Sequence, residues 1–159
     1  MNIQKLGAEE SEKFSTINQL KYITMRNNKN LFLDDKREPR DAFNENLYSN
    51  PVHLFVEEEW EVVKNYKEFV QWILEFGVPD IISFDHDLAP SHYTPKKYWT
   101  DYEKSKEWQN KQKHTEPTGA GCALWLRKHC EDNNLELPYI MVHSANPVGR
   151  DKIINILQK

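Results

Sequence analysis

Residues 80–87 read Asp-Ile-Ile-Ser-Phe-Asp-His-Asp, and the rest of the sequence is organised around them. The central residues 81–84 favour a β-strand, and they run directly into two acids and an imidazole. A buried strand is held by its apolar packing, so the groups at its carboxyl end are fixed where the crevice of an α/β sheet opens. The stretch therefore predicts a strand that presents chemistry at its carboxyl end.

The same pattern occurs twice more along the chain. Upstream, Leu31–Leu33 is followed by Asp34 and Asp35; downstream, Tyr139–Val142 is followed by the polar segment His143–Pro147. Each is a short apolar run that ends in acids, imidazoles or hydroxyls. We expect three strands to bring these ends to one site.

A βαβ unit is predicted to lead into the strand at residues 81–84. Trp60–Val63 alternates as a short strand, and Tyr66–Phe76 carries an apolar stripe at helical spacing. Asn65 is a candidate N-cap with Glu68 three residues later, and Gly77 is a candidate C-cap. The crossover should be right-handed. Segment 34–40 is predicted as a turn and 41–59 as irregular, and two further helices are expected over 122–133 and from Gly149 onward.

Two segments lie outside this pattern. Residues 1–29 have a moderate helical spacing over 9–25 and predict an appended helix, which leaves 30–159 as the α/β domain. Residues 88–117 form a long, polar, aromatic-rich insertion in which 101–113 could be a polar helix. It is either a lid or substrate loop, whose aromatic rings could stack on bases, or a surface insertion whose rings only pack on the domain.

Length and charge limit the class of protein. A chain of 159 residues predicts one domain, and a formal net charge of −4 does not suggest a nonspecific nucleic-acid binder. Cys122 and Cys130 are about 12 Å apart along the expected helix, too far for a disulfide, so they are interpreted as reduced thiols. No apolar run reaches the length of a membrane span and no leader is evident, so we expect a cytoplasmic protein.

The acids suit a divalent cation. Asp34, Asp35, Asp85 and Asp87 offer hard oxygen ligands for magnesium or manganese. Coordination by His86 or His143 would shift the preference toward manganese, iron or zinc. Four carboxylates in one crevice could not all ionise without a compensating cation.

The other polar residues suit the cleavage of a phosphoester. His143 is the candidate acid or base and His86 the candidate ligand or second base, although these two roles could be exchanged. Thr118 is a candidate N-cap at a helix N-terminus that would favour an anion. The candidates for binding a phosphate are Ser144, Asn146, Arg37, Thr118 and Arg150.

The arrangement resembles the response-regulator receiver domain, in which an acid pair binds magnesium beside a phosphoacceptor aspartate. On that pattern Asp34 and Asp35 match the acid pair, Asp85 matches the acceptor and Ser144 matches the hydroxyl residue. The chain departs from receivers because it has no fifth strand with the receiver lysine and because two more polar residues crowd Asp85. An ordinary phospho-relay is therefore not expected.

Four motifs of the chain together carry a closer resemblance. They are Leu-Phe-Leu-Asp-Asp-Lys-Arg-Glu-Pro (31–39), Ser-Phe-Asp-His-Asp-Leu (83–88), Thr-Gly-Ala-Gly-Cys-Ala-Leu-Trp-Leu (118–126) and Val-His-Ser-Ala-Asn-Pro-Val-Gly-Arg (142–150). By these motifs the sequence is more similar to the cyclic-phosphate processing receiver domains of bacteria and their phages. The resemblance implies an α/β fold with a small doubly wound parallel sheet of about four strands, in the order 2-1-3-4, with flanking helices. It also implies processing of cyclic phosphates, such as the 2′,3′-cyclic phosphate ends of cleaved RNA.

Two functions from different classes follow. The first is a metal-dependent phosphoesterase that acts on a cyclic phosphate, with Asp85, His86 and His143 as its catalytic residues. The second is a non-catalytic receiver-like module that binds or sequesters a nucleotide or a protein. The expected partners are a phosphate-containing small molecule or an RNA end, and a protein could bind through 88–117 or 1–29.

Overall fold

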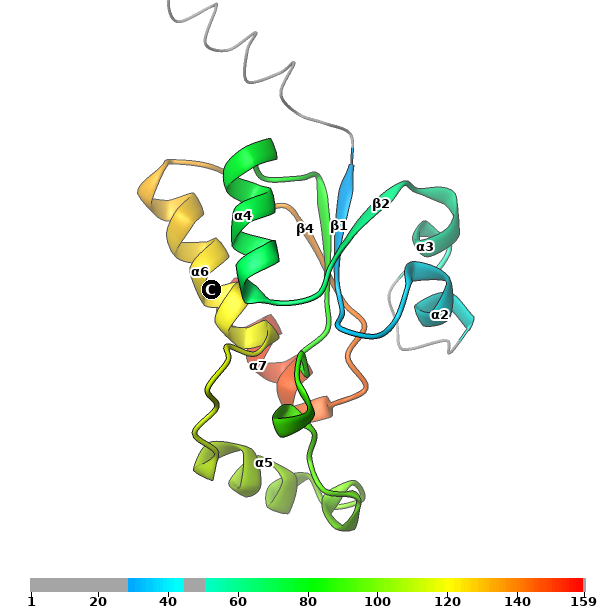
Figure 1. The fold of residues 1–159 in the computed structure, drawn as a ribbon, viewed down its shortest axis with the longest axis vertical. Helices are drawn as coiled ribbons and strands as arrows, with labels where there is room; N and C mark the ends of the chain where they lie inside the picture. The colour runs from blue at the N-terminus through cyan, green and yellow to red at the C-terminus, as the bar shows by residue number, and fades with distance from the viewer. Residues whose placement is uncertain (1–28, 45–50, 159) are drawn as a thin grey trace, which may run out of the picture.

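A four-stranded parallel sheet forms the centre of the protein in a computed structural model, which describes residues 29–44 and 51–158 (Figure 1). The strands are β1 (Asn30–Leu33), β2 (Trp60–Val63), β3 (Ile81–Phe84) and β4 (Tyr139–Val142), in the order β2-β1-β3-β4. This confirms the doubly wound, receiver-like sheet expected from the sequence. The predicted N-terminal helix lies outside the described residues.

Three helices cover one face of the sheet. They are α4 (Tyr66–Phe76), α6 (Gly119–Asp132) and α7 (Pro147–Leu157). Alternate residues of the central strands point to this side, and they pack with the apolar stripes of the three helices in the larger core. Its fully buried members include Leu31, Ile82 and Phe84, with Phe69 of α4 and Leu126 of α6.

Two short helices, α2 (Pro39–Asn44) and α3 (Leu54–Glu57), cover part of the other face (Figure 1). The sequence predicted a turn over 34–40 and an irregular segment over 41–59, and this prediction is wrong for residues 39–44 and 54–57. Pro39 begins α2 at the helical position where its missing N–H costs nothing. Both helices are too short to show apolar periodicity, and each buries one apolar side chain, Ala42 or Phe55, in the smaller core with Phe32.

The βαβ unit forms as predicted. The Asn65 side chain accepts a hydrogen bond from the backbone N–H of Glu68 (2.9 Å), and Gly77 ends α4 with a φ of 88°. Helices α6 and α7 each begin two or three residues earlier than predicted, at Gly119 and Pro147. Cys122 and Cys130 of α6 are free and buried, as expected.

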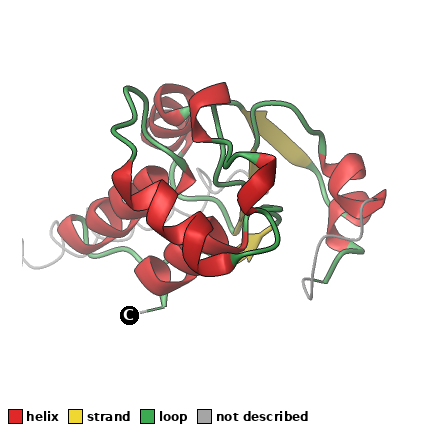
Figure 2. Ribbon diagram, turned by 90° about the horizontal axis from the view of Figure 1, so that it is seen from below, coloured by secondary structure: helices red, strands yellow, loops and turns green. Residues whose placement is uncertain are grey.

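The 88–117 insertion crosses the carboxyl end of the sheet and contains α5 (Tyr102–Lys111), which confirms the predicted polar helix. Two single-turn segments precede it, η1 (Pro90–His92) and η2 (Lys96–Tyr98). Figure 2, seen from below, shows helical segments in front of most of the sheet. Among the described helices, none combines the length and apolar character that a membrane span requires.

Candidate functional site

A cavity of about 570 Å³ opens where β1, β3 and β4 end. One wall carries Asp34, Asp85 and Asp87, which follow β1 and β3. The loop between β4 and α7 forms a second wall, and the 88–117 insertion forms a third. The structure thus brings the acids together with the insertion in one hollow, at the edge of the sheet where parallel α/β folds bind ligands.

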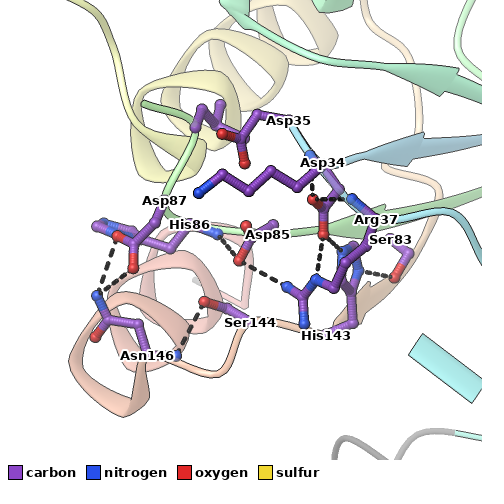
Figure 3. A network of polar contacts seen from close by, with 12 residues as sticks. Asp34, Asp35, Arg37, Ser83, Asp85, His86, Asp87, His143, Ser144 and Asn146 are labelled. Carbon is purple, nitrogen blue, oxygen red and sulfur yellow. Dashed lines mark hydrogen bonds and ion pairs between the residues drawn. The ribbon is translucent and has the colours of Figure 1, made fainter. Parts of the chain in front are cut away.

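Strand register explains why distant polar residues meet here. Leu33, Phe84 and Val142 lie side by side across β1, β3 and β4. The next residue along each strand continues the row: the backbone N–H of Asp85 donates to Leu33 O (2.8 Å) and that of His143 donates to Phe84 O (2.9 Å). The side chains of Asp34, Asp85 and His143 therefore lie near one another (Figure 3).

Three acids form a candidate metal site. Asp34, Asp35 and Asp85 each offer a carboxylate oxygen, and these oxygens lie within 4.8 Å of one another. Burial and the nearby charge of Asp34 together raise the pKa of Asp85 to about 7, against the opposing effect of Arg37. Burial and Asp34 also raise the pKa of Asp35. Ionised carboxylates in this cluster lack sufficient compensating charge, which fits the requirements of a divalent cation.

Asp34 is the best-bonded acid of the three. Its Oδ1 accepts hydrogen bonds from the backbone N–H groups of Lys36 and Arg37, both 2.8 Å long. Its Oδ2 accepts from the Nε of Arg37 (2.7 Å) and from the Nε2 of His143 (3.1 Å). Burial alone would raise its pKa, but these hydrogen bonds, with His143 as the strongest, lower the pKa of Asp34 to about 2. Asp34 is thus ionised and held in a fixed position by its hydrogen bonds.

Arg37 joins two of the acids. Its guanidinium contacts Asp34 Oδ2 through Nε (2.7 Å) and Asp85 Oδ1 through an Nη atom (3.4 Å). The side chain lines the cavity, as its predicted phosphate-binding role requires. Arg37 therefore supplies part of the positive charge that the acids need.

His143 lies behind the acids and does not line the cavity. Its ring is fully buried and stacks on Phe32, with the ring centroids 4.1 Å apart. Its Nδ1 is 2.7 Å from the hydroxyl of Ser83 (Figure 3). A neutral imidazole with its proton on Nε2 satisfies both contacts, because it donates to Asp34 and accepts from Ser83. The geometry places His143 to orient Asp34.

His86 also faces away from the cavity. Its Nδ1 is 2.7 Å from Asp87 Oδ1, and its ring lies against the backbone of Gly149 so closely that a Cβ there would overlap it. Asp87 in turn accepts from the amide of Asn146, with both N–O distances 3.2 Å. The carboxylate of Asp87 lines the cavity, apart from the three clustered acids and held by His86 and Asn146.

The remaining predicted phosphate-binding residues occupy different positions. Ser144 is buried, hydrogen-bonds Asp85 and accepts from the backbone N–H of Asn146 (3.2 Å). Thr118 and Arg150 do not line the cavity. The first N–H of α6, that of Gly119, donates to the carbonyl of His86 (2.8 Å), so this helix end braces the strand end.

The structure adds residues that sequence reasoning did not single out. Lys36 and Tyr93 line the cavity: the Lys36 ammonium lies 4.2 Å from the centroid of the Tyr93 ring, and the Tyr93 hydroxyl donates to Asp35 (3.3 Å). Trp99, Thr94 and Ser105 of the insertion also line it. The aromatic content of 88–117 was the available signal, but no spacing rule indicates which of its rings reach the acids.

Comparison with known proteins places most of the chain in a family. The chain is similar over residues 29–159 to a family described as the cyclic-phosphate processing receiver domain. No curated protein and no solved structure matches significantly.

Proposed function

The chain belongs to the cyclic-phosphate processing receiver domain family, and from that premise we propose that it is a divalent-metal-dependent phosphoesterase that opens cyclic phosphodiesters. The observation that carries the proposal is the cluster of Asp34, Asp35 and Asp85, of which Asp34 and Asp85 line a cavity that also holds the guanidinium of Arg37. Receiver domains bind Mg²⁺ through acidic residues, so this cluster is where magnesium or manganese would bind. The substrate proposed is a 2′,3′-cyclic phosphate, at an RNA end or on a nucleotide.

Charge compensation is the first requirement of this reaction. A divalent cation held by the three acids would act as a Lewis acid on a phosphoryl oxygen. Arg37 and Lys36 line the same cavity and carry positive charge that can bind the other non-bridging oxygen. They lie two and three residues after Asp34, and its carboxylate fixes their backbone by accepting from their N–H groups.

Proton transfer is assigned to Asp87. It is the cavity carboxylate outside the cluster of three, and neither His86 nor His143 lines the cavity. In this scheme Asp87 takes a proton from the attacking water and passes it to the leaving ribose oxygen. One P–O ester bond breaks, a new P–O bond to the water oxygen forms, and the product is a phosphomonoester. His86 and His143 act as positioning residues for Asp87 and Asp34.

The direct test is turnover by the purified full chain with Mn²⁺ or Mg²⁺. We expect it to convert 2′,3′-cyclic AMP to the 2′- or 3′-monophosphate. Chromatography of the reaction mixture measures this conversion. Chelation of the metal and the Asp85→Asn change should each abolish the reaction. No conversion across a panel of cyclic mononucleotides, cyclic dinucleotides and RNA-terminal cyclic phosphates would contradict the proposal.

One observation supports the alternative, a non-catalytic module that binds a nucleotide or a protein. Asp34 accepts four hydrogen bonds, which occupy the lone-pair positions that a carboxylate offers. A cation at Asp34 must therefore displace a donor, and Arg37 is the one on the cavity side. Tight ligand binding that is insensitive to chelation and gives no turnover would favour this alternative.

A further inference from the structure

We propose that the 88–117 insertion provides a nucleobase subsite with Trp99 as its stacking surface. The ligand of the cavity would then be a nucleoside phosphate rather than a phosphate ester without a base. The inference rests on the proposed function for the phosphate side of the ligand, and it adds which part of the chain recognises the rest.

The size and lining of the cavity support this subsite. At about 570 Å³ the cavity falls in the range of whole small-molecule sites, whereas a phosphate group alone needs only its acidic side. The lining is predominantly apolar, although five of its residues are charged, namely Asp34, Lys36, Arg37, Asp85 and Asp87. The apolar surface must therefore come largely from elsewhere in the lining, where Trp99 and Pro147 are found. A ligand that fills the cavity needs a charged end and a flat or apolar end.

Trp99 has the properties of a stacking platform. Its side chain is 63% exposed, yet it lines the cavity. The indole N–H donates to the backbone carbonyl of Thr94 (2.8 Å), which fixes the ring and leaves its surface for another contact. The ammonium of Lys96 lies 5.8 Å from the ring centroid. Nucleobases stack on such rings in proteins that bind single-stranded nucleic acid.

Two hydroxyl groups are positioned to contact the edge of a base. Ser105 and Thr94 both line the cavity. The Ser105 hydroxyl donates to Tyr98 O (2.7 Å), which leaves its oxygen as an acceptor. The Thr94 hydroxyl accepts from the amide of Gln109 (3.1 Å), which leaves its proton to donate. The subsite therefore offers one donor and one acceptor beside a stacking surface.

The insertion is fastened at a set distance from the acids. Gln109 of α5 also donates to Oδ1 of Asn146 (2.9 Å), and Asn146 binds Asp87. The Tyr102 hydroxyl donates to Asp151 of α7 (2.7 Å). These contacts hold the aromatic wall and the acidic wall in one frame, so a bound nucleotide can reach both without rearrangement of the insertion.

The test compares two phosphomonoesters, one with a base and one without. Calorimetric titration of the full chain with Mn²⁺ measures the affinity for adenosine 3′-monophosphate and for ribose 5-phosphate. We expect the nucleotide to bind at least about fivefold more tightly, which is the lower end of what one stacked base contributes. Trp99→Ala should remove this preference while leaving the affinity for ribose 5-phosphate unchanged, and Trp99→Phe should retain most of it. Tyr139→Ala, which removes an exposed ring of β4 outside the cavity lining, is the matched control.

Each result bears on the subsite separately from the reaction. Equal affinity of the wild-type chain for nucleotide and sugar phosphate overturns the subsite, even if cyclic phosphates are hydrolysed. A nucleotide preference that survives Trp99→Ala, in a variant with an unchanged circular-dichroism spectrum, also overturns it. Nucleotide preference that depends on Trp99, without any turnover, supports the subsite and contradicts only the phosphoesterase. The wild-type comparison holds even if Trp99→Ala does not fold.

Discussion

The Nε2 of His143 lies 3.1 Å from Oδ2 of Asp34, although β3 separates the two strands from which these residues come. The imidazole has no exposed surface. Its other nitrogen is 2.7 Å from the Ser83 hydroxyl. A buried imidazole that donates to a candidate metal ligand is the arrangement that fixes ligand orientation in metal sites.

Two variants of His143 should therefore differ in metal affinity. Gln can place its amide where Nε2 stands and keep the donor to Asp34, whereas Asn can reach only the Nδ1 position beside Ser83. We expect His143→Asn to weaken Mn²⁺ binding by about 10–100-fold and His143→Gln to weaken it less. Excess Mn²⁺ should restore turnover in both, as measured by steady-state kinetics over a metal titration.

A general-acid role for His143 leads to a different result. Turnover by both variants would then stay low at saturating Mn²⁺, because no added cation replaces a lost proton donor. That outcome would contradict the role of His143 as a positioning residue.

Arg37 and a divalent cation should compete for the same carboxylates. The guanidinium lies against Asp34 and Asp85, two of the three clustered acids. Removing this charge in Arg37→Gln should tighten Mn²⁺ binding by about tenfold, or about 1.4 kcal/mol, because a repelling unit charge is lost at close range. The same change should lower turnover, because a phosphate contact is lost with it.

The control for Arg37 is Arg40→Gln, which removes an exposed positive charge on α2 outside the cavity lining. Calorimetry on both variants gives the comparison. Equal metal affinity in the two would show that Arg37 and the cation do not share Asp34.

The sheet could be predicted from sequence because its strands are short apolar runs that end abruptly. Leu31–Leu33 and Ile81–Phe84 are followed at once by acids, so their bounds and their common edge are both visible. The helix over Tyr66–Phe76 was equally accessible, since Asn65 and Gly77 mark its two ends. Helices α2 and α3 were not, because six and four residues are too few to show a period.

The sequence identified which residues form the site, but not the directions in which their side chains point. A residue after a strand end can point into the crevice or back under the sheet, and strand register decides which. His143 follows β4 on the same side as Phe32 and stacks on it, so its ring is directed away from the cavity. Tyr93 reaches Asp35 across 58 residues of chain, and this contact depends on how the insertion packs on α7.

Gly119 should be required for the position of Asp85. A Cβ at Gly119 would overlap the backbone carbonyl of Asp85, which neither group can avoid by a side-chain rotation. We expect Gly119→Ala to lower the free energy of unfolding by about 1–3 kcal/mol and to weaken Mn²⁺ binding as the β3 end shifts. Urea titration and calorimetry measure the two effects.

Gly77→Ala separates stability from site geometry. Gly77 has a φ of 88°, so alanine there is strained, but no atom lies within 4 Å of the added Cβ. The residue precedes β3 and thus lies at the opposite end of that strand from the acids. This variant should lose about 1–3 kcal/mol of stability and keep the wild-type affinity for Mn²⁺. Unaltered Mn²⁺ binding in Gly119→Ala as well would contradict the role given to Gly119.

His92 should make the stability of the domain fall in mild acid. Its ring is buried and joins the two ends of the insertion: Nδ1 accepts from the backbone N–H of Leu88 and Nε2 donates to Glu116 O, both 3.0 Å long. Burial, together with the nearby ring of His114, lowers the pKa of His92 below its ordinary value of 6.5. Protonation of Nδ1 would break the bond to Leu88.

The sign of the effect follows from the lowered pKa. Below pH 6.5 the unfolded chain takes up a proton at His92 that the folded chain resists. The contribution of His92 to the free energy of unfolding is therefore fully present above pH 6.5, and it decreases as the pH falls from 6.5 toward the pKa of His92 in the folded chain. Asn at position 92 can keep an acceptor for Leu88 and cannot titrate. His92→Asn should therefore be less stable at pH 7, because it lacks the donor to Glu116, but lose less stability on acidification, by up to about 1.4 kcal/mol per pH unit. Urea titrations at pH 7, 6 and 5 measure the free energy of unfolding, and the His53→Asn change at an exposed histidine is the control. If stability falls equally with pH in the wild type and in His92→Asn, His92 is not the group responsible.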